Sequence, residues 1–127
     1  MTTGRTYTLD RAELGMVRIY LRRSDRIRKR GWFGLRSSIA LHHHLVVKAR
    51  ANGILNAVSH HTHFGYSNHG SIGADGAEWV DPQLTICVEL IGESHQLETF
   101  CLDHGELLDH KVITYKPLER WQITDKA

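Results

Sequence analysis

The chain has 127 residues, which suits one domain around a single hydrophobic core and leaves too little chain for two ordinary domains. Its 41% hydrophobic and 24% charged composition is typical of a soluble globular protein, and no apolar run approaches the roughly 20 residues of a membrane span. The net charge of +2 conceals an asymmetry, because residues 1–50 hold twelve Lys/Arg against three acids and residues 51–127 hold four against eleven. That asymmetry suits self-assembly or an anionic ligand.

The polar start of the chain lacks the apolar core of a signal peptide. Cys87 and Cys101 show no CxxC or zinc spacing, so they are expected to be reduced and partly buried thiols. A cytoplasmic location follows as the expectation.

The first half of the chain predicts an arm, a strand and a helix. Residues 1–14 are mixed and polar and are expected to form a flexible arm, whereas Met16–Leu21 alternates like a half-buried strand. Arg22–Arg36 is then expected to be a basic loop. A helix is predicted from Ser37 or Ser38, as the N-cap, to Asn52-Gly53.

The second half repeats the strand–helix–strand order. The predicted elements are a strand at Leu55–Thr62, a strand at Pro82–Ile91, a helix opening at Gly92 and closed by Gly105, a strand at Leu107–Tyr115, and a tail at Glu119–Thr124 that can add an edge strand after Pro117. This βαββαβ order predicts an α+β, ferredoxin-like sandwich over residues 15–127, with an antiparallel sheet and two helices on one face. The other face, with Tyr20, Thr85 and Cys87, is not strongly polar and favours a homo-oligomer.

Between the second and third predicted strands lies a loop of residues 63–81 with four glycines. Connections longer than about a dozen residues are usually functional or disordered. Its few large apolar groups offer little to bury, so residues 67–78 are expected to be mobile in the free protein and to become ordered on binding.

With these elements in order, the chain from Met16 to Tyr115 resembles the PII-like family of trimeric signalling proteins, especially its small uncharacterised branch. The resemblance rests on the order and spacing of several segments: the strand Met16–Leu21 followed by Arg23-Ser24-Asp25, then Ala49–Ile54, His63–Ser67, Leu84–Leu90 followed by Glu98-Thr99-Phe100, and Gly105–Val112. It implies a non-enzymatic homotrimer in which the loop of residues 63–81 is the T-loop, which contacts a partner, often a membrane transporter. Proteins of this kind associated with inorganic-carbon uptake make a bicarbonate or other ion transporter the expected partner.

The resemblance also implies an adenine nucleotide (ATP, ADP or AMP), with bicarbonate as a possible second ligand, in clefts between subunits. The residues carried over to this site are Phe64, Gly65, Tyr66, Gly105, Glu106, Leu107, Leu108, Arg120 and Trp121. The sequence departs from the PII proteins proper in two places. The segment before the last strand lacks their glycine-rich, lysine-ended stretch, and the T-loop shows no match to their modified tyrosine.

Histidines suggest an alternative, a divalent-metal-binding trimer resembling the cation-tolerance proteins of the same fold. His61 and His63 share one face of an extended strand and are the candidate zinc, copper or nickel ligands. His42, His43 and His44 point in three directions on a helix and cannot converge on one metal. A pH-sensing role for the histidines is equally open.

Two further function classes find little support. The basic stretch from Arg22 to Arg36 with Trp32 and Phe33 resembles a nucleic-acid patch, but the net charge of +2 argues against that partner. Asp75, Glu78 and Asp81 lie near His69 in sequence, yet no nucleophile–base–orienter set is recognisable, so an enzyme is not expected.

Overall fold

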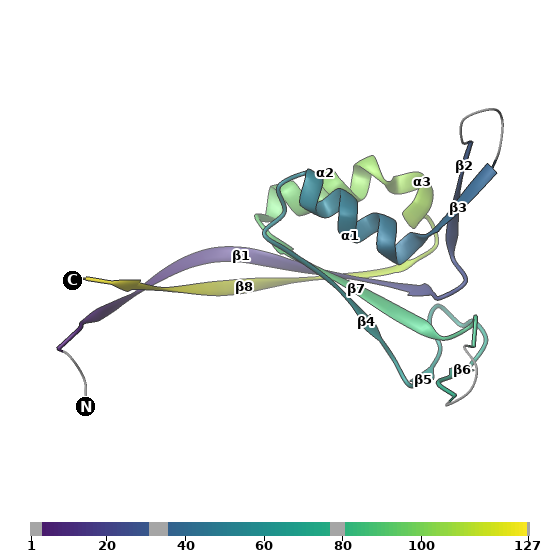
Figure 1. Cartoon of the computed structure of the whole chain (residues 1–127), viewed down its shortest axis with the longest axis horizontal. Helices are drawn as coiled ribbons and strands as arrows, with labels where there is room; N and C mark the ends of the chain where they lie inside the picture. Colours follow the sequence, from purple (N-terminus) through teal and green to yellow (C-terminus); the bar gives the residue numbers. More distant parts are fainter. Residues whose placement is uncertain (1–3, 31–35, 77–80, 127) are drawn as a thin grey trace.

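A computed structural model describes residues 4–30, 36–76 and 81–126 of the chain. The main sheet has the order β4-β7-β1-β8, and its neighbouring strands are all antiparallel. The strands are β1 (Tyr7–Arg22), β4 (Asn56–His61), β7 (Thr85–Gly92) and β8 (Val112–Asp125). The helices α1 (Leu41–Ala51), α2 (Ser94–Asp103) and α3 (Gly105–Leu108) lie on one face of this sheet (Figure 1). The predicted α+β, ferredoxin-like fold is therefore confirmed.

The core lies between the sheet and the helices. It is built by alternate residues of the two central strands and by the inward faces of α1 and α2. Its most deeply buried large side chains are Ile19, Leu21, Leu45, Ile86, Val88, Leu90 and Leu97. Burying each such side chain stabilises the fold by roughly 1.5–3 kcal/mol, so the alternate core residues of β1 and β7 fix which face of the sheet receives the helices. In the described part of the chain, no helix combines the length and apolar character needed to cross a membrane.

β1 and β8 run far beyond the body as a two-stranded ribbon that ends at the chain termini (Figure 1). Their register runs from Tyr20↔Val112 to Tyr7↔Asp125. The expected flexible arm of residues 1–14 is therefore strand from Tyr7 onward, and the expected break at Pro117 does not occur. Proline is tolerated there because β8 is an edge strand, on which a missing N–H breaks no ladder on the outer side.

The basic segment after β1 is a hairpin and not the loop that was predicted. β2 (Arg26–Arg30) pairs antiparallel with β3 (Arg36–Ala40), while Gly31, Trp32, Phe33 and Gly34 lie outside the described residues. The predicted serine N-cap is also wrong, since Ser37 and Ser38 belong to β3 and α1 begins at Leu41 without a side-chain cap. The N–H of Leu41 instead donates to the backbone oxygen of Asp25 at 2.8 Å.

Two boundaries near the second helix also differ from expectation. The predicted helix closed by Gly105 ends earlier, since α2 ends at Asp103, and Gly105 instead opens the short helix α3. Leu107 and Leu108 therefore belong to α3, and the last strand begins at Val112. Leu108 is drawn into the core, which a local sequence pattern does not reveal.

Candidate functional site at the base of the long loop

The long loop is closed at its base by a small hairpin. β5 (Phe64–Gly65) pairs with β6 (Gly73–Ala74), and the N–H of Asp75 donates to the backbone oxygen of His63 at 2.6 Å. Asp81 holds the returning chain, because its two carboxylate oxygens accept from the N–H groups of Ala74 and Gln83, each at 2.9 Å. The stem of the loop is therefore fixed by backbone contacts, and residues 77–80 lie outside the described part.

Beside this stem lies a cavity of about 260 Å³ where three segments of the chain converge. They are the end of β1 with the turn that follows it, the loop between β5 and β6, and the turn that leads into β8. The lining residues are Tyr20, Leu21, Arg22, Asp25, Ser67, Asn68, Asp109, His110 and Lys111. The base of the long loop thus meets the turn before the last strand within one chain.

Asp25 organises the floor of this cavity. Its Oδ2 accepts a hydrogen bond from Lys111 Nζ at 2.7 Å and another from the N–H of Arg22 at 2.9 Å. The side chains of Asp25 and Lys111 are each 23% exposed, so the ion pair is only partly screened by water. Through Asp25, the turn before β8 is tied to the end of β1 and to the first residue of α1.

The two loops that line the cavity are also joined directly. The side-chain amide of Asn68 donates to the backbone oxygen of His110. Asn68, His69 and His110 all have positive φ, at 51°, 57° and 64°. Such left-handed residues cost backbone energy and persist where tertiary contacts hold them, often at ligand sites.

The charged groups that line the cavity are balanced, with Arg22 and Lys111 facing Asp25 and Asp109. Lys111 is paired with Asp25, whereas Arg22 has no carboxylate partner among the described residues, and one guanidinium nitrogen lies 2.9 Å from the position that a Cβ on Gly70 would take. His110 and Asp109 approach at 3.5 Å, but both side chains are largely exposed, so this pair contributes little. A phosphate or carboxylate entering here meets the Arg22 guanidinium and a lysine that can exchange partners.

The nucleotide residues expected from the resemblance fall into separate places. Phe64 and Tyr66 lie at the loop stem, with exposed fractions of 72% and 61%, while Gly105–Leu108 forms α3. The Leu108 side chain is 4% exposed and packs in the core, so it cannot line a ligand site. The structure therefore gathers only part of the expected set at the loop base.

Arg120 and Trp121 lie on the ribbon, at the opposite end of the same chain from the loop stem (Figure 1). As successive strand residues, they point to opposite faces. The indole N–H of Trp121 donates to Glu119 Oε2 at 3.0 Å, and the guanidinium of Arg11 lies 5.1 Å from the Trp121 ring centroid. Within one chain these two residues therefore do not meet the other expected nucleotide contacts.

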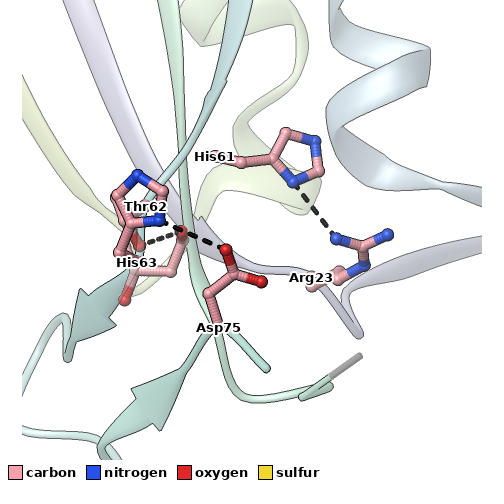
Figure 2. A network of polar contacts seen from close by, with 6 residues as sticks. Arg23, His61, Thr62, His63 and Asp75 are labelled. Atoms are coloured by element: carbon pink, nitrogen blue, oxygen red, sulfur yellow. Dashed lines mark hydrogen bonds and ion pairs between the residues drawn. The ribbon is translucent and has the colours of Figure 1, made fainter. Parts of the chain in front are cut away.

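The two candidate metal ligands are held by different partners (Figure 2). His61 Nδ1 lies 3.1 Å from a guanidinium nitrogen of Arg23, whereas His63 Nδ1 lies 3.2 Å from Asp75 Oδ2. Because a guanidinium can only donate, His61 accepts at Nδ1. Within residues 4–30, 36–76 and 81–126, no three His, Cys, Asp or Glu side chains gather as a metal-binding group. The geometry thus gives a metal site no support.

His61 also belongs to a cluster of basic groups near the start of α1. Its ring lies 5.7 Å from the ring of His42 in an edge-on arrangement, and the Nδ1 of His42 is 3.2 Å from Ser59 Oγ. Burial, followed by the neighbouring His61 and Arg23, lowers the pKa of His42 below its usual value. His42 is therefore expected to be neutral at physiological pH.

The sequence reading missed Arg22, Asp25, Asn68 and Lys111 as cavity residues. One signal was available, because Asp25 is the only acid between Glu13 and Asp75. A solitary carboxylate in so basic a stretch marks a specific ion-pair partner, although the sequence cannot say that the partner is Lys111, 86 residues away.

The chain was compared with known families and structures. The family model described as DUF190: Uncharacterized ACR, COG1993 matches residues 14–120. A structure from Thermus thermophilus, described as a PII-like signalling protein, aligns with a TM-score of 0.53 at 16% identity, covering 89% of this chain and 92% of that one. The CPII structure from Thiomonas intermedia, described as bound to ADP and bicarbonate, aligns with a TM-score of 0.56 at 12% identity, covering 87% and 91%. Among curated proteins, none matches this chain.

Proposed function

The chain belongs to the DUF190 family and shares the fold of PII-like proteins, and from that premise we propose that it is a PII-like regulatory protein. In this proposal it binds an adenine nucleotide at the base of the long loop and uses the loop of residues 63–81 to control a membrane transporter. The observation that supports the proposal most is the cavity in which the loop base, Arg22 and the Asp25–Lys111 pair come together.

The proposed phosphate contacts are Arg22 and Lys111. Arg22 offers a guanidinium that can bind phosphate oxygens bidentately, and Lys111 can leave Asp25 for a more highly charged partner. Asp25 opposes the phosphates in this arrangement, so the site binds an anion only when Lys111 turns from Asp25 toward the ligand. Exchange of this ion pair links ligand binding to the turn that precedes β8.

The site is proposed to be completed by a neighbouring subunit of a homotrimer. A cavity of about 260 Å³ is smaller than most ligand pockets, which usually measure about 300–1,000 Å³. The exposed indole of Trp121 and the exposed Arg120 are available to a second chain, where the ring can stack on adenine. The CPII neighbour is described with ADP and bicarbonate, and we extend both ligands to this chain as the first to test.

Calorimetry tests the nucleotide proposal. The protein is titrated with ATP, ADP, AMP and cyclic AMP, each with and without bicarbonate, and light scattering establishes whether its mass is about three times 14.5 kDa. Lys111→Gln is expected to weaken nucleotide binding about tenfold or more, because a charge-assisted contact contributes about 1.5–3 kcal/mol. Lys116→Gln, an exposed change on β8, is the matched control and should bind like the parent.

Hydrogen exchange tests the switch. We expect residues 67–76 to exchange faster than the strand β7 in the free protein and to gain protection when the ligand or transporter binds. A folded trimer that binds none of the nucleotides at millimolar concentration refutes nucleotide binding. Protection of residues 67–76 equal to that of β7 without ligand refutes the mobile loop.

A further inference from the structure

A second basic surface lies beside the cavity, on the β2–β3 hairpin and the start of α1. The sequence from residue 26 to residue 74 contains no Asp or Glu, and it holds seven Lys/Arg and seven of the ten histidines. The described side chains that the fold gathers here are Arg23, Arg26, Arg28, His42 and His61, which together are called the arginine face below. So long an acid-free run predicts a surface without internal counter-charges.

The β2–β3 register leaves its arginines open to solvent. Arg26 pairs with Ala40 and Arg28 with Ser38, so each arginine stands opposite a small residue on the same face of the hairpin. Arg26 and Arg28 are alternate residues of β2, and such residues lie about 6.6 Å apart along a strand. Arg26 reaches Ser38 Oγ at 3.5 Å, and both arginines are exposed. Ile27, on the opposite face, packs against the core and fixes the outward direction of Arg26 and Arg28.

The arginine face places guanidinium groups beside the two imidazole rings. Among the described residues, Arg23, Arg26 and Arg28 form no ion pair with a carboxylate. Arg23 instead contacts His61, and the first turn of α1, whose dipole is positive there, carries no acidic residue. Gathering cations at the positive end of a helix is unfavourable in isolation, so this surface is complementary to an extended anionic partner.

The position of the arginine face in the fold bears on which kind of anionic partner it can meet. The β2–β3 hairpin and the β5–β6 stem lie at the same end of the molecule, the hairpin on the helix side of the sheet and the stem on the other side (Figure 1). Eleven of the fourteen acids follow residue 74, and several lie on α2 and α3, among them Glu98, Asp103 and Glu106. Two of these acids, Asp75 and Asp81, lie at the loop stem, at the same end as the hairpin, so it is the exposed Arg26 and Arg28, and not the overall charge distribution, that suit this surface to an anionic partner.

We propose that the arginine face binds the anionic headgroups of a phospholipid bilayer. The choice of lipid over another polyanion rests on the proposed function, because a loop that reaches a transporter brings this end of the molecule to the membrane surface. Polybasic segments are attracted to anionic lipid within about one Debye length, and arginine binds phosphate bidentately. Lipid contact concentrates the protein on the membrane and presents the loop of residues 63–81 to its target.

Vesicle co-sedimentation tests this proposal with the full chain and without transporter or nucleotide. The vesicles contain either phosphatidylcholine alone or phosphatidylcholine with phosphatidylglycerol, at about 50 and about 300 mM salt, which shortens the Debye length. Arg26→Gln/Arg28→Gln is expected to lower the partition coefficient about 30-fold, since each basic residue near an anionic surface contributes about fivefold. Lys48→Gln/Arg50→Gln, in the last turn of α1, removes the same charge at another place and should change binding less than about threefold. Arg26→Lys/Arg28→Lys keeps the charge and should retain binding within about threefold.

Binding that requires the anionic lipid, falls with salt and depends on Arg26 and Arg28 more than on Lys48 and Arg50 supports the proposal. An absence of binding to anionic vesicles overturns it, as does an equal loss in the two glutamine variants. Binding to single-stranded and duplex DNA is measured by fluorescence anisotropy and compared with binding to the anionic vesicles. Tighter binding to DNA than to vesicles at about 150 mM salt assigns the face to nucleic acid and overturns the lipid proposal. Because no nucleotide is present, failure of nucleotide binding leaves these outcomes unchanged.

Discussion

Gly73 offers the sharpest test of the way the loop stem is packed. It is buried in β6, and a Cβ added to it would lie 2.6 Å from three backbone atoms of Gln83 and Leu84. Ordinary carbon contacts are about 3.5–4.0 Å, so the stem must move by roughly 1 Å away from the entry to β7. Overpacking of this kind typically costs about 1–3 kcal/mol, and backbone atoms cannot swing aside as a flexible side chain can.

Gly73→Ala is therefore expected to lower the melting temperature. An unfolding entropy of about 2.1 cal/mol/K per residue over this chain converts 1–3 kcal/mol into a decrease of about 4–11 °C. The measurement is thermal unfolding followed by circular dichroism at one fixed protein concentration. Gly105→Ala is the control, because no atom lies within 4 Å of the position of its Cβ, and it should be neutral or slightly stabilising. An unchanged melting temperature in Gly73→Ala would show that the stem does not pack against the entry to β7.

Three further predictions concern individual side chains. The folded-state pKa of His42 is lowered, so the unfolded chain binds a proton at this residue more readily, and the free energy of unfolding should fall as pH decreases below about 6.5. Urea unfolding of the parent and of His42→Gln is compared at about pH 5.5 and about pH 7.5, and the variant should lose less stability at the lower pH. Identical losses in the two proteins would contradict this prediction. Glu13 lies directly across from Glu119, so Glu13→Gln should raise the free energy of unfolding by about 0.2–1 kcal/mol in the same assay, and a decrease would contradict the observed register. Burial raises the pKa of both Cys87 and Cys101, so iodoacetamide should modify them much more slowly in the folded protein than in guanidinium; equal rates would contradict that burial.

Local pattern predicted the elements that bury a regular face. Val17, Ile19 and Leu21 alternate in the sequence and are all buried in the structure, because a period of two can place its apolar side chains on only one side of a sheet. The order of these elements then predicted the ferredoxin-like topology, since two right-handed crossovers leave few other arrangements.

The local sequence pattern gave wrong predictions for the elements that are stabilised by residues far away in the sequence. The segment from Tyr7 to Leu14 reads as a polar arm, yet it is a strand because it pairs with residues 118–125 at the other end of the chain. Likewise, Pro117 is a sequence signal for a break, which the edge position of β8 removes. Composition could not distinguish the β2–β3 hairpin from a basic loop, because its apolar contribution to the core includes a single side chain of β2, that of Ile27.

The candidate site likewise combines features that the sequence predicted with contacts that only the tertiary structure shows. The sequence by itself determined that a long glycine-rich loop lies between two strands, and that the charges of the two halves of the chain are opposite. Only the tertiary structure decided that Lys111 pairs with Asp25, that Asn68 reaches the turn at His110, and that His61 and His63 have different partners. These contacts join residues up to 86 positions apart, and a hydrogen bond of that kind depends on where the sheet and helices place its two ends, which no local periodicity records.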